Sequence, residues 1–499
     1  MREATLSTDV TVLHGQIHAM AEEITRLKEQ LFLATRRQFG KSSEAFSIEQ
    51  GLLFHTDDVA LVEVNDEESG DSEPSPPPKK KTVRQAVMFS KDTPVVRQEL
   101  DIPDADKTCG CCGSQLHRFG EDCTYQVEYI PAQTRVIETA RPKYACRQCE
   151  TGVKQQALPP SPIPKSMATA SLLAFLIVSK YLDHQPLHRI QQMLARTGIT
   201  LPRSTQCDWL MACARLLQRL TDRMKQDLVC SPQIFSDDTI LPLQNDQKDR
   251  HRVIQARLWV YATQSKTGPP IVLYDFTRTR SKQGPHSFLS GYRGYLQADA
   301  YSGYDGLYKN GVKEVACLAH LRRYFFEASE QEQTPGPAHE ALMMIQKLYR
   351  IERDIKHYSH KKRKKQRRLH AKPLLKKFRR WLEHQQVSRL PKGKLGKAIQ
   401  YGLNHWDGFV RYCEAGYLEI DNNLSERAMK PVALGRKNYL FTGSERGGKA
   451  AATLYSLVES AKANQLNPYE YLKDVLQKLP SATDNDLTEL LPYHWQAEA

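Results

Sequence analysis

Residues 233–243 read QIFSDDTILPL, a run in which apolar residues surround two adjacent aspartates, Asp237 and Asp238. Two further runs rich in β-branched and aromatic residues follow closely, RLWVYAT (257–263) and PIVLYDF (270–276). Runs of this length and composition, joined by short connections, predict three consecutive β-strands. Because side chains alternate between the two faces of a strand, only one of the two aspartates can face a given side of the sheet.

The segment after these strands alternates between helix and strand. The expected elements, in order, are a short helix near HSFLSGY (286–292), a strand in GYLQADAY (294–301), a helix in YDGLYKN (304–310), a strand in VKEVACLAH (312–320) and a helix in LRRYFFEA (321–328). Three strands, helix, strand, helix, strand, helix is the order of the ribonuclease-H-like fold. In that fold the first strand's centre lies beside the fourth strand's end, so we expect Asp237 and Asp299 to converge.

The third acidic candidate is Glu426, in the stretch EIDNNLSERAMKPVALGRKNYLF (419–441). Two carboxylates on adjacent strands with a third on a later helix suit a pair of Mg²⁺ ions in in-line phosphoryl transfer. A second interpretation needs no metal, because Asn423 as an N-cap and Glu426 three residues later would form a capping box. The two interpretations are compatible, since the cap would also aim the helix that carries Glu426.

A long helical block separates the fifth strand and its helix from this stretch. HEALMMIQKLYRIERDIKHY (339–358) is periodic, and KKRKKQRR (361–368) carries seven basic residues in eight. We interpret residues 331–415 as an α-helical insertion between two parts of one core, 231–330 and 416–475, with a C-terminal tail at 476–499. The basic run is a candidate phosphate contact or, equally, a solvated helix face.

Residues 161–230 predict a helical module ahead of the core. The helix PLHRIQQMLART (186–197), the turn GITLP and the helix STQCDWLMACARLLQRL (204–220), with Ser204 as its cap, form a helix-turn-helix pattern. This pattern places Arg203 and Gln206 at the start of a DNA-reading helix. Helical hairpins also serve as scaffolding, and that alternative stays open.

Cysteines are concentrated in residues 94–160. Cys109 and Cys112 form one C-x-x-C pair and Cys146 and Cys149 another, with strand-like runs between the pairs. Two such knuckles joined by β-structure predict a zinc-ribbon-like site, in which four thiolates hold one structural Zn²⁺. A redox-active pair is the alternative for a C-x-x-C motif.

The N-terminal segment 1–45 carries a heptad repeat over residues 10–34. One register holds Val10, Ile17, Ile24 and Leu31, and the register three residues on holds Leu13, Met20, Leu27 and Ala34. This pattern favours a parallel two-stranded coiled coil, and hence a homo-oligomer of at least two chains. The alternative is an amphipathic helix packed on its own protein. Residues 46–93 have the acidic, Ser- and Pro-rich composition of a disordered linker.

The composition of the whole chain narrows the class of partner. The 499 residues carry a formal net charge of +14, which favours a polyanion such as nucleic acid. The longest apolar run, SLLAFLIVS (171–179), is too short to span a bilayer, so we expect no membrane partner. Eleven cysteines, an odd number, argue against a secreted disulfide framework, and we expect a cytoplasmic protein.

Taken together, these motifs resemble transposases of the insertion-sequence-66 family, which belong to the DDE class. The resemblance covers nearly all of the chain. It rests on the heptads, the paired C-x-x-C motifs and the stretches FGKSSE (39–44), PKSMATASLLAFLIVSKYLDHQPLHR (164–189), SDDT (236–239), GYLQADAYSGYD (294–305), CLAHLRRYF (317–325), DNNLSERAMKPVALGRKNYLFTGSERGG (421–448) and NPYEYL (467–472).

The resemblance implies a multidomain α/β protein with a ribonuclease-H-like core. It implies binding of double-stranded DNA at the element's terminal inverted repeats, then Mg²⁺-dependent strand cleavage and transfer into target DNA, with Mn²⁺ able to replace Mg²⁺. The catalytic acids would be Asp237, Asp299 and Glu426. The family's usual Asp-Glu-Thr is here Asp237-Asp238-Thr239, and Lys430 stands where Arg is usual.

Four further residues would contact DNA: Arg427, Arg436, Lys437 and His320. His320 belongs to a C-x-x-H element with Cys317, and a structural histidine is the alternative for it. The resemblance also implies small accessory proteins encoded beside this one and a nucleoid-associated location in a prokaryote. The competing hypothesis for the function is a catalytically inactive, transposase-derived DNA-binding regulator.

Overall fold

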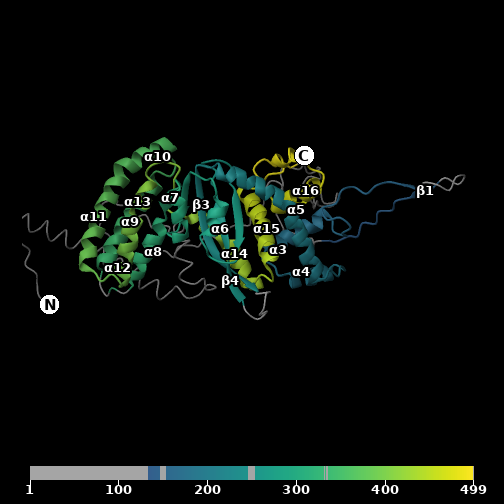
Figure 1. The fold of residues 1–499 in the computed structure, drawn as a ribbon, viewed down its shortest axis with the longest axis horizontal. Helices are drawn as coiled ribbons and strands as arrows, with labels where there is room; N and C mark the ends of the chain where they lie inside the picture. Colours follow the sequence, from purple (N-terminus) through teal and green to yellow (C-terminus); the bar gives the residue numbers. More distant parts are fainter. Residues whose placement is uncertain (1–132, 146–152, 245–252, 331, 333–334, 498–499) are drawn as a thin grey trace, which may run out of the picture. The chain divides into compact units, whose positions relative to one another are not determined.

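The computed structural model describes residues 133–145, 153–244, 253–330, 332 and 335–497 (Figure 1). The predicted coiled coil, the linker and the four cysteines of the predicted zinc site lie outside these residues. At the start of the described part, β1 (Lys143–Ala145) and β2 (Val153–Gln155) pair as a two-stranded antiparallel ribbon.

A five-stranded mixed sheet forms the centre of the fold. The strands are β3 (Gln233–Gln244), β4 (Val253–Ala262), β5 (Val272–Thr277), β6 (Tyr295–Ala298) and β7 (Lys313–Ala316). They lie in the order β5-β4-β3-β6-β7. The first three strands are antiparallel neighbours, whereas β6 runs parallel to both β3 and β7. The five strands predicted from the sequence are therefore present.

Helices follow and cover these strands. Three connect or follow strands within the sheet: α6 (Gln283–Phe288), α7 (Asp305–Lys309) and α8 (Leu318–Ser329). Six more share one hydrophobic core with the sheet: α3 (Ala170–Tyr181), α4 (Leu187–Arg196), α5 (Arg203–Val229), α14 (Asn423–Tyr439), α15 (Glu445–Ala463) and α16 (Pro468–Lys478). The predicted helical module of residues 161–230 thus packs into the same core as the sheet.

One local prediction in this core needs correction, and the C-terminal residues extend the core. Helix α5 begins at Arg203 after Pro202, without a side-chain cap, so Ser204 lies inside its first turn. Pro202 fixes its own backbone angle and so favours the start of a helix without a capping hydroxyl. At the C-terminus, Leu487 and Leu491 are buried in the core, and the Tyr471 hydroxyl donates to the Leu490 carbonyl at 2.9 Å. The predicted tail is therefore packed.

Helix α15 also lies along the outer edge of the sheet. The backbone amides of Val272 and Tyr274 in β5 donate to the hydroxyls of Ser460 (2.9 Å) and Ser456 (2.8 Å). The Ser460 hydroxyl donates in turn to the Val272 carbonyl at 2.9 Å. The backbone groups of an edge strand have no neighbouring strand on one side, and here two serines of a helix take that place.

The predicted helical insertion forms a second hydrophobic core against β7 and α8. Its helices are α9 (Pro337–Asp354), α10 (His360–Gln366), α11 (Lys372–Ser388), α12 (Lys394–Asn404) and α13 (Trp406–Arg411), with a π-helical turn at Arg367–Ala371. Leu375, Phe378 and Leu382 of α11 recur every three or four residues and are buried, the spacing of one helix face. No described helix offers an apolar stretch of membrane-spanning length.

Candidate active site

The two adjacent aspartates of β3 have different environments. The side chain of Asp238 is 1% exposed and accepts hydrogen bonds from Arg257 Nη1 (3.0 Å) and from Arg280 Nε and Nη2 (2.9 and 2.8 Å). Asp237 accepts a hydrogen bond from the Asp238 amide at 2.8 Å. Two guanidinium groups therefore neutralise Asp238, and Asp237 is the member of the pair whose carboxylate is not committed to an arginine in this way.

Parallel pairing brings Asp299 to the same level as Asp237. Phe235 in β3 is the register partner of Gln297 in β6, and each aspartate lies two residues further along its chain. Parallel neighbouring strands lie about 4.8 Å apart, so side chains at matching positions are neighbours. Arg280 Nη2 also reaches Asp299 Oδ2 at 3.4 Å. The predicted convergence of the two aspartates is consistent with this register.

Glu426 comes from the first turn of α14, and the start of this helix is tied to β3 and to the junction between β7 and α8. Asn422, the N-cap residue, donates from its side-chain amide to the Ser236 carbonyl at 2.9 Å, one residue before Asp237. Its backbone amide donates to Cys317 Sγ at 3.2 Å, between β7 and α8. Asn422 is fully buried. The helix is thus aimed by bonds to residues more than a hundred positions away in the sequence.

The capping box predicted at Asn423 is wrong. The N-cap is one residue earlier, at Asn422, and it makes no side-chain cap hydrogen bond. The Glu426 side chain is 3% exposed, and both of its carboxylate oxygens are buried without a hydrogen-bond partner. A carboxylate that capped its own helix would accept the N-cap amide instead. The Glu426 carboxylate is therefore left for a role other than capping.

Burial and mutual repulsion set the protonation of the three acids. Burial, and next the Asp299 charge, hold the pKa of Asp237 well above its ordinary range. Burial also raises the pKa of Asp299, although the Arg280 charge opposes this. Burial, followed by the charges of Asp237 and Asp421, raises the pKa of Glu426 to about 9. Like charges this close in a poorly solvated site disfavour one another, so a cation among them would stabilise the ionised forms.

His320 lies beside Glu426. Its Nδ1 is 3.8 Å from Glu426 Oε1, and the ligand atoms of Cys317, His320 and Glu426 all lie within 4.8 Å of one another. Burial, and next the Arg323 charge, lower the pKa of His320 to about 4. The imidazole is therefore neutral near pH 7, and its position is next to the third acid rather than on an open surface.

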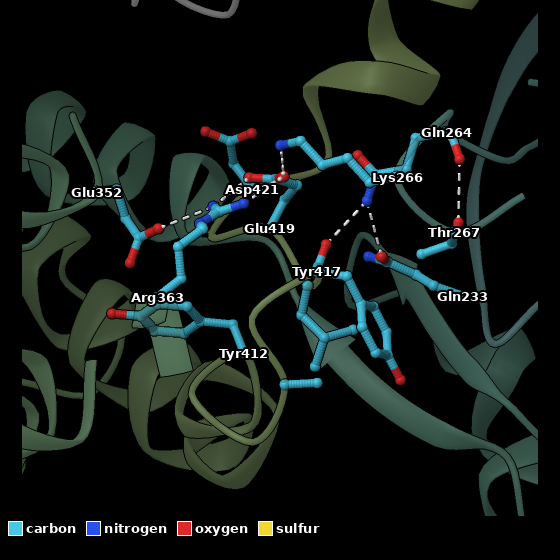
Figure 2. Close-up of polar contacts among 12 residues, drawn as sticks. Gln233, Gln264, Lys266, Thr267, Glu352, Arg363, Tyr412, Tyr417, Glu419 and Asp421 are labelled. Atoms are coloured by element: carbon cyan, nitrogen blue, oxygen red, sulfur yellow. Dashed lines mark hydrogen bonds and ion pairs between the residues drawn. The ribbon is translucent and has the colours of Figure 1, made fainter. Parts of the chain in front are cut away.

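The sheet holds the segment that leads into α14. Gln297 Nε2 donates to the carbonyls of Glu419 and Asp421, both at 2.8 Å, and Gln233 Nε2 donates to Gln297 Oε1 at 2.7 Å. Gln264 Nε2 donates to the Tyr417 carbonyl at 2.9 Å and to Gln233 Oε1 at 3.0 Å (Figure 2). Three glutamines, from β3, from β6 and from the segment just after β4, thereby fix the backbone just before Asn422.

The helical insertion holds the same segment from the other side. Figure 2 shows Arg363 between Glu352 and Glu419, with Lys266 also reaching Glu419. Arg363 Nη2 lies 3.3 Å from a carboxylate oxygen of each acid, and Lys266 Nζ lies 2.7 Å from Glu419 Oε1. Burial would raise the pKa of Glu419, but these cations, Arg363 first, lower it overall.

A second buried arginine completes this contact. Arg367 is fully buried; it pairs with Glu352 at 2.6 Å and donates to the carbonyls of Tyr412 (2.9 Å), Ala415 (2.8 Å) and Leu418 (2.8 Å). For these two arginines of the basic run 361–368, both predicted alternatives are wrong. Both side chains are buried, so they neither form a solvated surface nor reach a DNA phosphate. Their positions in α10 and in the π-helical turn direct them inward, toward Glu352.

The residues predicted to contact DNA divide into exposed and enclosed side chains. Arg203, Arg427 and Lys437 are exposed. Gln206 is fully buried and donates to the Leu201 carbonyl at 3.0 Å, so its prediction as a base contact is wrong for this structure. Arg436 is half-buried, and its Nη1 donates to the Ile240 carbonyl of β3, which ties α14 to the sheet.

Sequence reasoning missed three residues that shape the site: Arg280, Gln297 and Asn422. Each makes its important contacts with residues at least 19 positions away, and no local spacing or motif in the sequence signals such pairings. Asn422 is a partial exception, because it belongs to the DNN stretch (421–423) in which the sequence predicted a helix cap. Its neighbour Asn423 was the predicted cap, so the correct motif was found and the wrong residue chosen.

Comparison with known families agrees with this architecture. The family model described as "Transposase IS66 family" matches residues 165–450, more than half of the chain. The zinc-finger binding domain of transposase IS66 matches residues 106–150, which include all four paired cysteines, and the IS66 C-terminal element matches 456–493. A model described as "Transposase C of IS166 homeodomain" matches residues 26–97.

Full-length relatives lead to the same assignment. An uncharacterized protein of Sinorhizobium fredii (strain NBRC 101917 / NGR234), y4jD, is 34% identical over 510 residues, covering 98% of this chain and 99% of that protein. A second from the same strain, y4hP, is 32% identical and covers 80% of this chain and 76% of its own length. A third, y4qI, is 29% identical over 519 residues. The chain belongs to the IS66 family of transposases.

Proposed function

We propose that this transposase is a DDE-class enzyme that cleaves DNA at the ends of its element and joins the freed strand to target DNA, using Asp237, Asp299 and Glu426. One observation carries the proposal: the buried carboxylate of Glu426 has no hydrogen-bond partner, although it lies near enough to Asp237 and Asp299 for their charges to raise its pKa. Burying such a group without a partner is costly, and proteins retain that cost mainly at functional sites.

The strand topology supports a ribonuclease-H-like core. Three antiparallel strands followed by two parallel ones, in the order β5-β4-β3-β6-β7, is the arrangement expected for that fold. It accounts for the placement of the acids, because it sets Asp237 on the central strand and Asp299 just after its parallel neighbour. The helical insertion places Glu426 far from Asp237 and Asp299 in the sequence, although the fold allows all three acids to lie near one another.

The donor set fits divalent magnesium. Mg²⁺ prefers carboxylate oxygens, and three mutually repelling carboxylates gain most from a doubly charged cation. Asp237, Asp299 and Glu426 would hold two Mg²⁺ ions, for which Mn²⁺ can substitute. When bound, such ions activate the attacking oxygen and stabilise the leaving oxygen of the phosphodiester.

The protein's own side chains would position the DNA around these acids. Arg427 and Lys437, both exposed on α14, supply charge for backbone phosphates, and a neutral His320 can donate a hydrogen bond beside Glu426. Arg203 at the start of α5 would contact the terminal inverted repeat. Arg280 holds Asp238 and Asp299 in place, and Asn422 holds the start of α14 against β3.

The remaining parts of the chain complete the proposal. Cys109, Cys112, Cys146 and Cys149 would bind one structural Zn²⁺ in the zinc-finger region, and the N-terminal heptads would assemble at least a dimer. Small accessory proteins of the same element are expected partners, and the cytoplasm, at the nucleoid, is the expected location. A dimer would bring both ends of an element into one complex.

The test is nicking of a labelled duplex that carries the element's terminal repeat and flanking DNA, with Mg²⁺ and the full-length protein. Asp237→Asn, Asp299→Asn and Glu426→Gln should each reduce nicking about a hundredfold or more while gel-shift binding of the same duplex is retained. Glu470→Gln, which changes an exposed carboxylate on α16, is the matched control and should nick normally. A wild-type protein that binds the ends but never nicks them would instead be the inactive regulator.

A further inference from the structure

The insertion carries a strongly basic outer face. Between residues 361 and 397, fourteen Lys and Arg side chains are exposed, against a single acid, Glu383. The buried positions of this stretch follow one stripe, which includes Arg363, Arg367 and Ala371 at intervals of four. The exposed cations lie on the remaining surface of these helices. They are therefore a different set of residues from Arg363 and Arg367, which are buried and hold the segment before α14.

The length of this face matches a polymeric anion. Helix α10, the π-helical turn and α11 run without a break from His360 to Ser388, 29 residues. At about 1.5 Å of rise per residue such a helix is roughly 40 Å long, a little more than one turn of B-DNA. A small anion would occupy one or two of these cations. A duplex can follow the whole rod.

The position of the face in the fold distinguishes it from the predicted DNA-reading helix. The insertion packs against β7 and α8, at one edge of the sheet, whereas α5 packs beside β5 at the opposite edge (Figure 1). Asp237 and Asp299 belong to β3 and to the end of β6, between these edges. A duplex that crosses the acids from α5 would continue toward the insertion.

We propose that the exposed cations of α10–α12 bind the DNA duplex on the far side of the scissile phosphate, outside the element end. The inference rests on the proposed function, because it takes Asp237, Asp299 and Glu426 as the cleavage site. Lysine ammonium groups act as point charges on phosphates and carry no sequence information. Such a contact suits flanking DNA, whose sequence changes at every new insertion site.

The experiment compares two duplexes with the full-length protein over a range of salt concentrations, by fluorescence anisotropy. One carries the terminal repeat with about 20 base pairs of flank, on the order of two turns; the other ends at the cleavage position. The test variant replaces Lys364, Lys365 and Lys376 by Gln. The control variant replaces Lys309, Lys313 and Lys449, which are also exposed and lie outside the insertion, and therefore changes the net charge by the same amount.

The insertion variant should bind the flanked duplex about tenfold more weakly, with a salt slope smaller by up to about 2.7, and bind the flank-free duplex as the wild type does. The control should match the wild type on both. Wild-type affinity and slope on the flanked duplex would overturn the inference, and so would an equal loss on both duplexes. Nicking by the wild-type protein is measured separately and tests the proposed function. The DNA-binding role of the insertion and the cleavage activity can therefore be refuted independently.

Discussion

Replacing Glu426 by Gln should make the folded protein more stable while it abolishes cleavage. The substitution keeps the size and shape of the side chain but removes its ability to ionise. Glu426 is buried and its oxygens have no hydrogen-bond partner, so the folded protein without metal holds the carboxyl group in its protonated form near pH 7. The unfolded chain ionises the same group freely. Folding near pH 7 must therefore add a proton to a carboxylate that is ionised in the unfolded chain, and this lowers the free energy of unfolding. Gln carries no ionisable proton, so the variant does not bear this cost.

The size of the effect follows from the two pKa values. The pKa of Glu426 rises from its ordinary 4.5 in the unfolded chain to about 9 in the folded one. Each pH unit between 4.5 and the working pH costs about 1.4 kcal/mol, so the cost at pH 7 is on the order of 3 kcal/mol. Because the folded-state pKa is raised, this cost grows as the pH increases from 4.5 toward 9. It is nearly absent below pH 4.5.

Urea unfolding in buffer without Mg²⁺ measures this directly. Glu426→Gln should exceed the wild type in free energy of unfolding by on the order of 3 kcal/mol at pH 7 and by less than about 1 kcal/mol at pH 5. Adding Mg²⁺ should stabilise the wild type more than the variant, because only the wild type keeps all three ligands. A variant no more stable than the wild type at pH 7, or a gap that does not shrink at pH 5, would refute this reasoning.

Three further outcomes follow from the contacts described. Asp238→Asn should lower the free energy of unfolding by about 2 kcal/mol in urea melts, because Arg257 and Arg280 lose a shared counter-charge; an unchanged melt contradicts this. Arg367→Met should lower it by about 3–5 kcal/mol, since buried Glu352 keeps only its longer contact with Arg363 and three buried carbonyls lose their donor; a loss under about 1 kcal/mol would show that the pair is dispensable. Cys109→Ser should reduce zinc, measured by elemental analysis, from one ion per chain; unchanged zinc would exclude this ligand.

Patterns that depend on neighbours in the sequence predicted the fold well. The short runs rich in apolar and β-branched residues predicted β3, β4 and β5, because strands that are buried in a sheet need such side chains. The helices of the insertion were found for the same reason. The expected convergence of Asp237 and Asp299 came from the strand arrangement of the ribonuclease-H-like fold, and the register between β3 and β6 is consistent with it.

Contacts between distant residues were beyond such reasoning. The capping box at Asn423 used the correct local rule, but the Ser236 carbonyl competes for the start of that helix, and only the folded chain brings it there. The basic run 361–368 was interpreted as a single surface. In the structure Arg363 and Arg367, four residues apart, are buried, and the other basic residues of the run are exposed. Gln206 was chosen for its place in a motif, and the fold buried it instead.

The serine contacts between α15 and β5 have a consequence for aggregation. An exposed edge strand is a template on which another chain can add a strand, and β5 is rich in the residues that favour such pairing. Ser456 and Ser460 occupy the donors and acceptors that a second chain would use. A chain that ends before α15 would retain β3 to β7 with that edge uncovered. Truncated copies of this protein are therefore expected to accumulate as insoluble assemblies rather than as folded fragments that compete with the intact enzyme for DNA.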